Sequence, residues 1–124
     1  MDTFEIVGLD HVVLACADVE RSLAWYCGEL GLEPVRVEEW RRGEVPFPSV
    51  RVDATTIIDL FARPPDGANM DHLCLVCASL DADAVAERFP GARTAHGLFG
   101  AQGYATSVYV ADPDGNTVEL RSYD

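Results

Sequence analysis

An internal repeat constrains the fold of this chain more than any other feature of its sequence. Three segments of the first half recur in the second half at offsets of 58 to 61 positions, in a chain of 124 residues. The matched pairs are 9–17 (LDHVVLACA) with 70–78 (MDHLCLVCA), 49–52 (SVRV) with 107–110 (SVYV), and 57–60 (IIDL) with 117–120 (TVEL). Because two copies are too few for a solenoid, we predict two related modules that pair to bury their apolar faces.

Each module is predicted to run strand, helix and then three strands. Strands are expected where Val, Leu, Ile and Cys gather in short runs between turn residues. These runs are 5–16, 32–40, 48–53 and 55–62 in the first module and 70–78, 92–95, 104–111 and 116–122 in the second. A tight turn at 112–116 (DPDGN) is expected between the last two, because Asp, Pro, Gly and Asn favour turns.

The two predicted helices differ in length. The first begins at the cap Asp18 and continues to about residue 30, with an apolar stripe at positions 23, 26, 27 and 30, and Gly31 ends it. The second is capped by Ser79 or Asp81 and stopped by the Pro-Gly pair at 90–91. Both modules therefore read as βαβββ units.

The size of the chain favours one domain. With 48% hydrophobic and 24% charged residues, 124 residues are enough for one ordinary globular core. We therefore expect a single domain over 1–124, with a first module at 1–66, a second at 67–124, and residues 67–69 in the linker.

The charge balance argues against several partners. Twenty-one acidic residues against nine basic ones, all of them arginine, give a formal charge of −12. A chain this acidic is a poor partner for nucleic acid or anionic membrane. No run approaches the roughly 20 apolar residues of a membrane helix, and the first ten residues lack a signal-peptide pattern. We therefore expect a cytoplasmic protein.

The four cysteines support a reducing compartment. All of them lie in apolar runs, where cysteine is typically a small buried hydrophobe. Cys74 and Cys77 form a C-x-x-C pair, but residues three apart on a strand point to opposite faces. We therefore expect this pair to be structural and not to share a metal.

The repeat also places polar residues at matching positions of predicted strands. His11 and His72 begin the first strand of each module, and Asp59 and Glu119 lie within the last. A single histidine of this kind is typically structural, with a partner such as Asp10 or Asp71. Two matched histidines and two buried carboxylates, however, are the ligand set of Zn²⁺, Ni²⁺, Fe²⁺, Mn²⁺ or Co²⁺. We therefore predict one divalent metal site held by these four residues.

Side-chain alternation along the strands extends this candidate site. Thr117 and Arg121 share the face of Glu119, because a strand repeats every two residues. The repeat pairs Arg51 with Tyr109 and Ser49 with Ser107. We predict that Arg51, Tyr109, Arg121 and Ser107 line a substrate cleft, where arginine suits an anionic or vicinal-oxygen substrate. Surface ion pairing is the alternative role of the arginines.

The remaining aromatic and imidazole side chains are assigned to packing or solvent. Trp25, Tyr26 and Phe61 are expected in the core, and Trp40 at a cleft edge or an oligomer contact. His96 has no repeat partner and lies in a Gly-rich run, so it is expected in a solvated loop.

These motifs resemble the vicinal oxygen chelate superfamily, which includes glyoxalase I, extradiol dioxygenases, methylmalonyl-CoA epimerase and bleomycin-resistance proteins. The resemblance covers nearly the whole chain. The segments that carry it are 9–14 (LDHVVL), 18–26 (DVERSLAWY) with 30–32 (LGL), 70–72 (MDH) and 107–120 (SVYVADPDGNTVEL). The last of these is similar to glyoxalase-domain-containing proteins.

The resemblance implies an α+β fold in which two βαβββ modules form an eight-stranded pair of open half-barrels around a metal-binding cleft. It implies metal ligation by His11, His72 and Glu119, with the fourth ligand, usually glutamate, at Asp59. Aspartate is one methylene shorter, so Asp59 is expected to ligate directly, to ligate through water, or to act as a base. A homodimer is also implied.

The resemblance leaves three functions open. The first is a glyoxalase-I-like isomerase or lyase whose metal binds adjacent substrate oxygens, with Glu119 or Asp59 as the catalytic carboxylate. The second is an extradiol-type Fe(II) dioxygenase that uses two histidines and one carboxylate. The third is a binding or resistance protein without turnover.

Overall fold

The computed structural model describes residues 4–65, 67, 69–111 and 117–124. Within these residues the chain forms eight β-strands, three α-helices and one π-helix. Contacts divide the chain into two compact units: unit 1 is Met1–His11 with His72–Asp124, and unit 2 is Val12–Asp71. Unit 1 therefore joins the start of the chain to its second half.

The order of the elements confirms the α+β class and the two βαβββ halves predicted from the repeat, with a short extra helix in the first half. The single domain and the module bounds 1–66 and 67–124 stay predictions. None of the described helices has both the length and the apolar character that crossing a membrane requires.

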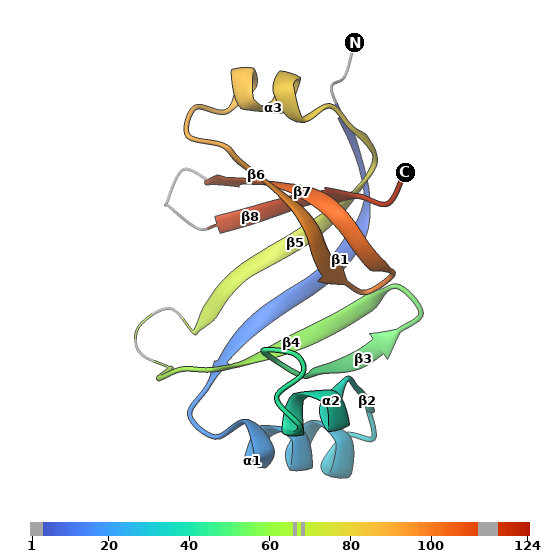
Figure 1. Cartoon of the computed structure of the whole chain (residues 1–124), viewed down its shortest axis with the longest axis vertical. Helices are drawn as coiled ribbons and strands as arrows, with labels where there is room; N and C mark the ends of the chain where they lie inside the picture. The colour runs from blue at the N-terminus through green and yellow to red at the C-terminus, as the bar shows by residue number, and fades with distance from the viewer. Residues whose placement is uncertain (1–3, 66, 68, 112–116) are drawn as a thin grey trace. The chain divides into compact units, whose positions relative to one another are not determined.

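Unit 1 is a sheet covered on one face by a helix. Its elements are the start of β1 (Phe4–Cys16), most of β5 (Met70–Leu80), α3 (Ala82–Arg88), β6 (Arg93–Gly100), β7 (Gly103–Ala111) and β8 (Thr117–Ser122). β8 pairs in parallel with β5 and antiparallel with β7, which pairs antiparallel with β6 (Figure 1). Val85 of α3 packs with Cys77, Val108 and Leu120. Because strand side chains alternate, Glu119 points to the opposite face.

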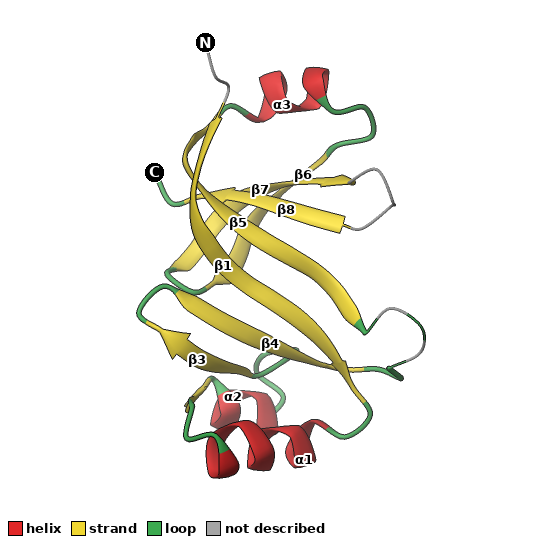
Figure 2. Cartoon of the chain, turned by 180° about the vertical axis from the view of Figure 1, so that it is seen from behind, coloured by secondary structure: helices red, strands yellow, loops and turns green. Residues whose placement is uncertain are grey.

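Unit 2 repeats this plan with more helix. Its elements are the rest of β1, α1 (Val19–Leu23), the π-helix η1 (Ala24–Glu29), β2 (Glu33–Val35), α2 (Val37–Arg41), β3 (Ser49–Asp53) and β4 (Thr56–Ala62). β3 pairs antiparallel with β2 and β4. Figure 2 shows α1 and α2 on the same side of β3 and β4. Leu23 and Val37 pack there on Val50 and Leu60.

The predicted helix caps are confirmed. Asp18 accepts a hydrogen bond from the backbone N–H of Arg21 at 3.1 Å, and Asp81 accepts one from Ala84 at the same distance. Asp81, rather than Ser79, is therefore the cap of α3. Gly31 has a φ of +77°, which only glycine adopts without strain, and ends the first helical segment.

The sequence predicted an α-helix that continues to about residue 30, but only the first part of this helix is α-helical. From Ala24 it becomes a π-helix, and the Leu30 N–H bonds to the carbonyl of Trp25. A π-helix has more residues per turn, so the end of the predicted apolar stripe, at Leu30, rotates away from the core, whereas Tyr26 and Cys27 still pack against it. Leu23 is buried, but Leu30 is 54% exposed, and Trp25, expected in the core, is 51% exposed.

The other aromatic side chains of unit 2 pack inward. Tyr26 packs against the core of unit 2 as expected. Trp40, expected at a cleft edge or an oligomer contact, packs against the same core. Phe61 is partly buried, and its ring lies 4.8 Å from that of Phe47.

Two predicted strands have different bounds. The strand expected at 32–40 ends at Val35, because Arg36 is left-handed with a φ of 58° and α2 follows it. The strand expected at 92–95 continues to Gly100 as β6, with an irregularity in register after Ala95. His96, expected in a loop, therefore lies in a strand, although it is exposed. The predicted turn at 112–116 lies outside the described residues.

Candidate metal centre

Three buried polar side chains of unit 1 meet at one point. β1 carries His11, β5 carries His72 and β8 carries Glu119. Their residues are 2%, 8% and 1% exposed, respectively. Ionisable side chains this deeply buried require partners, because burial of a lone charge is unfavourable by several kcal/mol.

The ligand-type atoms of these residues form a nearly equilateral triangle. His11 Nε2 lies 3.2 Å from His72 Nε2 and 3.1 Å from Glu119 Oε1, and His72 Nε2 lies 3.0 Å from the same oxygen. Ligands about 2.1 Å from one ion lie about 3.0 Å apart at right angles and about 3.4 Å apart at tetrahedral angles. The triangle therefore has the dimensions of three ligands on one face of an ion.

Asp10 fixes the orientation of the first histidine. Its carboxylate lies 2.7 Å from His11 Nδ1, which places a proton on that nitrogen. It also accepts hydrogen bonds from the Ala101 N–H at 2.9 Å and from the Tyr123 hydroxyl. When neutral, His11 then presents the lone pair of Nε2 to the triangle, and when protonated, it donates a hydrogen bond from Nε2 to Glu119. Electron-rich atoms this close need positive charge between them, supplied by a metal ion or by protons on the imidazoles.

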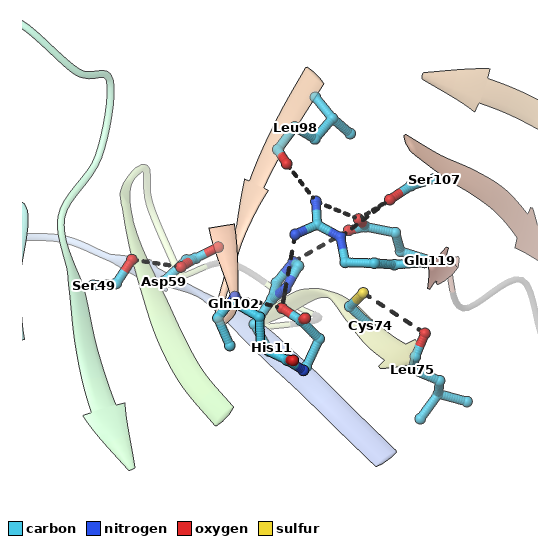
Figure 3. A network of polar contacts seen from close by, with 12 residues as sticks. His11, Ser49, Asp59, Cys74, Leu75, Leu98, Gln102, Ser107 and Glu119 are labelled. Carbon is cyan, nitrogen blue, oxygen red and sulfur yellow. Dashed lines mark hydrogen bonds and ion pairs between the residues drawn. The ribbon is translucent and has the colours of Figure 1, made fainter. Parts of the chain in front are cut away.

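A second set of contacts holds Glu119. Ser107 donates a hydrogen bond to Glu119 Oε2 at 2.7 Å (Figure 3), and Arg121 Nη2 lies 3.3 Å from the same oxygen. These contacts leave Oε1 directed at the two histidines. Arg121 also donates to the Leu98 carbonyl at 3.0 Å. Glu119 is therefore oriented from behind in the way that metal-binding carboxylates are.

Gly100 makes room for this buried arginine. Arg121 is fully buried, and a Cβ atom added to Gly100 would lie 1.5 Å from its Nη1 and 2.6 Å from the Tyr123 hydroxyl. No side chain larger than hydrogen fits at this position without moving the guanidinium. The glycine is therefore required by space and not by a turn.

The electrostatics of the centre keep both carboxylates ionised. Burial alone would raise the pKa of Glu119, but hydrogen bonds from His11, His72 and Ser107 lower it far below its usual range. Burial also opposes ionisation of Asp10, yet its bonds to His11 and Tyr123 make the net shift of its pKa downward.

Two further side chains flank Glu119. Tyr109 on β7 and Cys74 on β5 are its direct neighbours across the sheet. The Tyr109 ring meets that of His72 edge to face at 5.7 Å. Burial, followed by the nearby Glu119 carboxylate, raises the pKa of both the Tyr109 hydroxyl and the Cys74 thiol, which favours their neutral forms. Sγ of Cys74 lies within 4.8 Å of ligand atoms of Asp10 and His11.

The C-x-x-C pair divides between the two faces, as alternation predicted. Cys77 packs in the core below α3, whereas Cys74 faces Glu119. Both are buried free cysteines.

The structure thus brings together part of the predicted site. Unit 1 contains His11, His72 and Glu119, with Ser107, Tyr109 and Arg121 around them. Asp59 and Arg51 belong to unit 2. There, Ser49 donates a hydrogen bond to Asp59 at 2.5 Å (Figure 3), and Arg51 donates to the Asp53 and Ala54 carbonyls.

The sequence did not reveal the contacts that hold the centre from behind. The predicted site includes neither Tyr123 nor Gly100, and it gives Asp10 only as a structural partner of His11. The alternation that placed Arg121 on the face of Glu119 also places Tyr123 there, so this residue was within reach of sequence reasoning. No pattern in the sequence points to Gly100, because Arg121, whose guanidinium fills the space beside it, lies on another strand.

Comparisons with known proteins show the family of this chain. The sequence pattern of the Glyoxalase/Bleomycin resistance protein/Dioxygenase superfamily matches residues 8–120. The glyoxalase domain-containing protein RDO1 of Mycosarcoma maydis is 32% identical over 122 residues, which cover 93% of this chain and 68% of that protein. A virulence protein of Salmonella typhimurium is 28% identical over 128 residues, covering 93% of this chain and 83% of that protein.

Solved structures share the fold. Methylmalonyl-CoA epimerase from Mycobacterium tuberculosis superposes with a TM-score of 0.62 at 20% identity, over 98% of this chain and 91% of that one. A glyoxalase/bleomycin resistance protein/dioxygenase superfamily member from Vibrio splendidus gives a TM-score of 0.55 at 16% identity, over 92% and 98%. At these identities the likeness concerns the fold alone.

Proposed function

Because the chain belongs to the Glyoxalase/Bleomycin resistance protein/Dioxygenase superfamily, we propose that it is a divalent-metal-dependent enzyme acting on a small substrate that chelates through adjacent oxygens. His11, His72 and Glu119 hold the ion, which is Zn²⁺, Ni²⁺, Fe²⁺, Mn²⁺ or Co²⁺. The reaction that we favour is a glyoxalase-I-like isomerisation or lyase step.

The observation that carries this proposal is the triangle of His11 Nε2, His72 Nε2 and Glu119 Oε1, whose edges measure 3.0 to 3.2 Å. Contacts behind two of these atoms orient them: Asp10 holds His11, and Ser107 and Arg121 hold Glu119.

The charges of the buried groups support the same assignment. With neutral imidazoles, the ionised carboxylates of Asp10 and Glu119 face one buried cation, Arg121, which leaves a net charge of −1. A divalent ion changes this to +1. Such a centre favours a substrate that develops one negative charge, such as an enolate or alkoxide.

The residues of the chain have distinct roles in this proposal. A bound divalent ion acts as a Lewis acid toward the two substrate oxygens. His11, His72 and Glu119 would hold the ion, and the substrate oxygens would complete its coordination. Glu119 or Asp59 is the carboxylate that would move a proton of the substrate, and Glu119 would first have to leave the ion to do so. The neutral hydroxyl of Tyr109, which is hydrogen-bonded to Glu119 without substrate, would donate to a substrate oxygen once substrate binds.

An extradiol-type Fe(II) dioxygenase is the second candidate. The observation in its favour is that two histidines and one carboxylate meet within unit 1, and this three-ligand set is typical of non-haem iron oxygenases. Asp59 is then not needed as a ligand. In the isomerase, Asp59 is a fourth ligand or a second base, and Arg51 binds substrate.

The homodimer that the resemblance implies is a further proposal. Measuring the molecular mass of the protein in solution tests it.

The metal site is tested by elemental analysis and titration of protein purified without added metal. Wild type is expected to bind one divalent ion per chain. His11→Ala and Glu119→Ala should weaken binding at least about 100-fold, because two ligands rarely hold such an ion. His96→Ala is the matched control and should bind like wild type, since the His96 imidazole contacts Thr106 instead. Wild type that takes up no stoichiometric ion would overturn the proposal.

The reaction class is tested with the metal-loaded protein. For an isomerase or lyase, deuterium from D₂O should enter the carbon next to the chelating carbonyl of α-hydroxycarbonyl substrates, as measured by proton NMR. A dioxygenase should instead consume oxygen with a catechol. Loss of either activity in Asp59→Ala, without loss of metal, would assign Asp59 to catalysis. Tight ligand binding that survives both chelation and His11→Ala would show a binding protein instead.

A further inference from the structure

A row of three side chains crosses the sheet of unit 1 and leads away from the candidate metal centre. Tyr109 on β7 lies directly opposite Glu119 on β8 and, on its other side, opposite Arg93 on β6. Residues directly opposite each other share a face of a sheet, so all three side chains emerge on the face of the centre. Neighbouring strands are about 4.8 Å apart, which puts the Arg93 backbone about 10 Å from that of Glu119.

The side chains of this row are in contact. The guanidinium carbon of Arg93 lies 4.7 Å from the centroid of the Tyr109 ring, and the same ring meets His72 at 5.7 Å. Tyr109 is partly buried and Arg93 is exposed. The stacking thus fixes the guanidinium beside the centre while leaving it open to solvent.

Arg93, like Arg88, forms no ion pair with a carboxylate among the described residues of this acidic chain. Arg41, Arg42 and Arg63 are also exposed, but each forms an ion pair with a nearby acidic side chain. The cation–π contact with Tyr109 uses only the flat face of the Arg93 guanidinium. The N–H groups at its edge stay available for a carboxylate or phosphate, which arginine binds in a bidentate manner.

We propose that Arg93, held on Tyr109, binds a second anionic group of the substrate, a carboxylate or phosphate, a few carbon atoms away from the oxygens that chelate the metal. This inference rests on the proposed metal centre and adds the substrate class: a vicinal-oxygen compound with an acidic tail. Arg93 is thus a specificity-determining residue that does not touch the reacting atoms.

The test compares chelators with and without a tail on the Co²⁺-loaded protein. Acetohydroxamate binds metals through two adjacent oxygens, and the monohydroxamates of succinic and glutaric acid add a carboxylate. Binding is followed through the visible absorption of Co²⁺. Wild type should bind at least one acidic probe about 10-fold more tightly than acetohydroxamate, because a charge-assisted bidentate contact is gained.

Variants separate recognition of the tail from the rest of the site. Arg93→Ala should remove the preference and leave the affinity for acetohydroxamate unchanged, whereas Arg93→Lys should keep part of it. Arg88→Ala is the matched control, because Arg88 is also exposed and stacks on Phe4 and Phe89. It should keep the full preference.

Two contrary results are distinguishable. Co²⁺-loaded wild type without any preference, or a preference that survives in Arg93→Ala, overturns the role of Arg93 and leaves the metal centre standing. Failure of wild type to bind Co²⁺ at all overturns the metal centre, and the role of Arg93 with it.

Discussion

The two units contain the same buried pair of side chains in different surroundings. In unit 2, Ser49 donates a hydrogen bond to Asp59 at 2.5 Å, and in unit 1, Ser107 donates one to Glu119 at 2.7 Å. Both serines are fully buried, and the carboxylates are 2% and 1% exposed. The duplicated strands therefore provide a buried hydroxyl and carboxylate twice.

The residue two positions after each carboxylate differs between the units. It is Phe61 in the first copy, packed on Phe47, and Arg121 in the second, paired with Glu119. The Asp-His dipeptides differ as well, because Asp10 is buried against His11 whereas Asp71 forms an ion pair with Arg63. The two units thus share a strand arrangement, and differences at one or two matching side chains give their buried carboxylates different partners.

The largest difference between the units is expected from Arg121→Met. It leaves the carboxylates of Asp10 and Glu119 buried without their cation, and the free energy of unfolding should fall by about 3–5 kcal/mol. Phe61→Leu, at the matching position, should lower it by less than about 1.5 kcal/mol. Urea unfolding of the metal-free protein measures both. Equal losses would mean that the charge of Arg121 is unimportant.

Gly100→Ala should act through the same arginine. The new methyl group would overlap the Arg121 guanidinium, and we expect a loss of about 2–3 kcal/mol in thermal or urea unfolding. Gly8→Ala, which meets open space, should stay within about 0.5 kcal/mol of wild type. In an Arg121→Met background, Gly100→Ala should cost clearly less, because only the overlap with the Tyr123 hydroxyl remains. A full additive loss there would contradict the proposed overlap.

The lowered pKa of Glu119 should make the free energy of unfolding depend on pH in the acidic range. Its pKa in the folded chain lies below its ordinary value of 4.5. A group whose folded pKa is lowered stabilises the fold above its unfolded pKa, and this contribution is lost as the pH falls. Below pH 4.5 the loss is at most about 1.4 kcal/mol per pH unit for this group. Metal-free Glu119→Gln should therefore show a shallower decline between pH 4.5 and 2.5 in urea unfolding than wild type. If the free energy of unfolding of both proteins fell equally with pH, Glu119 would not be the source of the pH dependence.

The smallest effects are expected from replacing the two matching serines, Ser49 and Ser107. Ser107→Ala and Ser49→Ala each remove a hydrogen bond to a buried carboxylate, so each should reduce the free energy of unfolding by about 1–2 kcal/mol. Ser107→Ala should also weaken metal binding about 10-fold, because Glu119 loses a contact that orients it. Metal titration of both variants checks this. A stronger metal defect in Ser49→Ala would make unit 2 the more important partner of the ion.

Local features of the fold were predictable from the sequence. The caps Asp18 and Asp81 bond to backbone three residues away, and the alternation that separates Cys74 from Cys77 needs only the strand itself. The repeat of the Asp-His dipeptides directed attention to His11 and His72 in the same way. Such features depend on residues that are close along the chain, so they can be predicted from the sequence alone.

Departures from the predicted elements have a different origin. The π-helix at Ala24–Glu29 and the left-handed Arg36 interrupt a predicted α-helix and a predicted strand, and Leu30 at the end of the apolar stripe is exposed. The hydropathy pattern of the segment does not encode an i to i+5 hydrogen bond, because an α-helix with the same residues satisfies that pattern equally well.

The sequence by itself determined the duplicated strand and helix order, the helix caps and the residue types of a metal centre. Only the tertiary structure decided that His11, His72 and Glu119 meet, and which groups stand behind them. Asp10 binds the Ala101 N–H 91 positions away and the Tyr123 hydroxyl 113 positions away. Contacts of this range depend on strand register, and a shift of one residue would turn each side chain to the other face of the sheet.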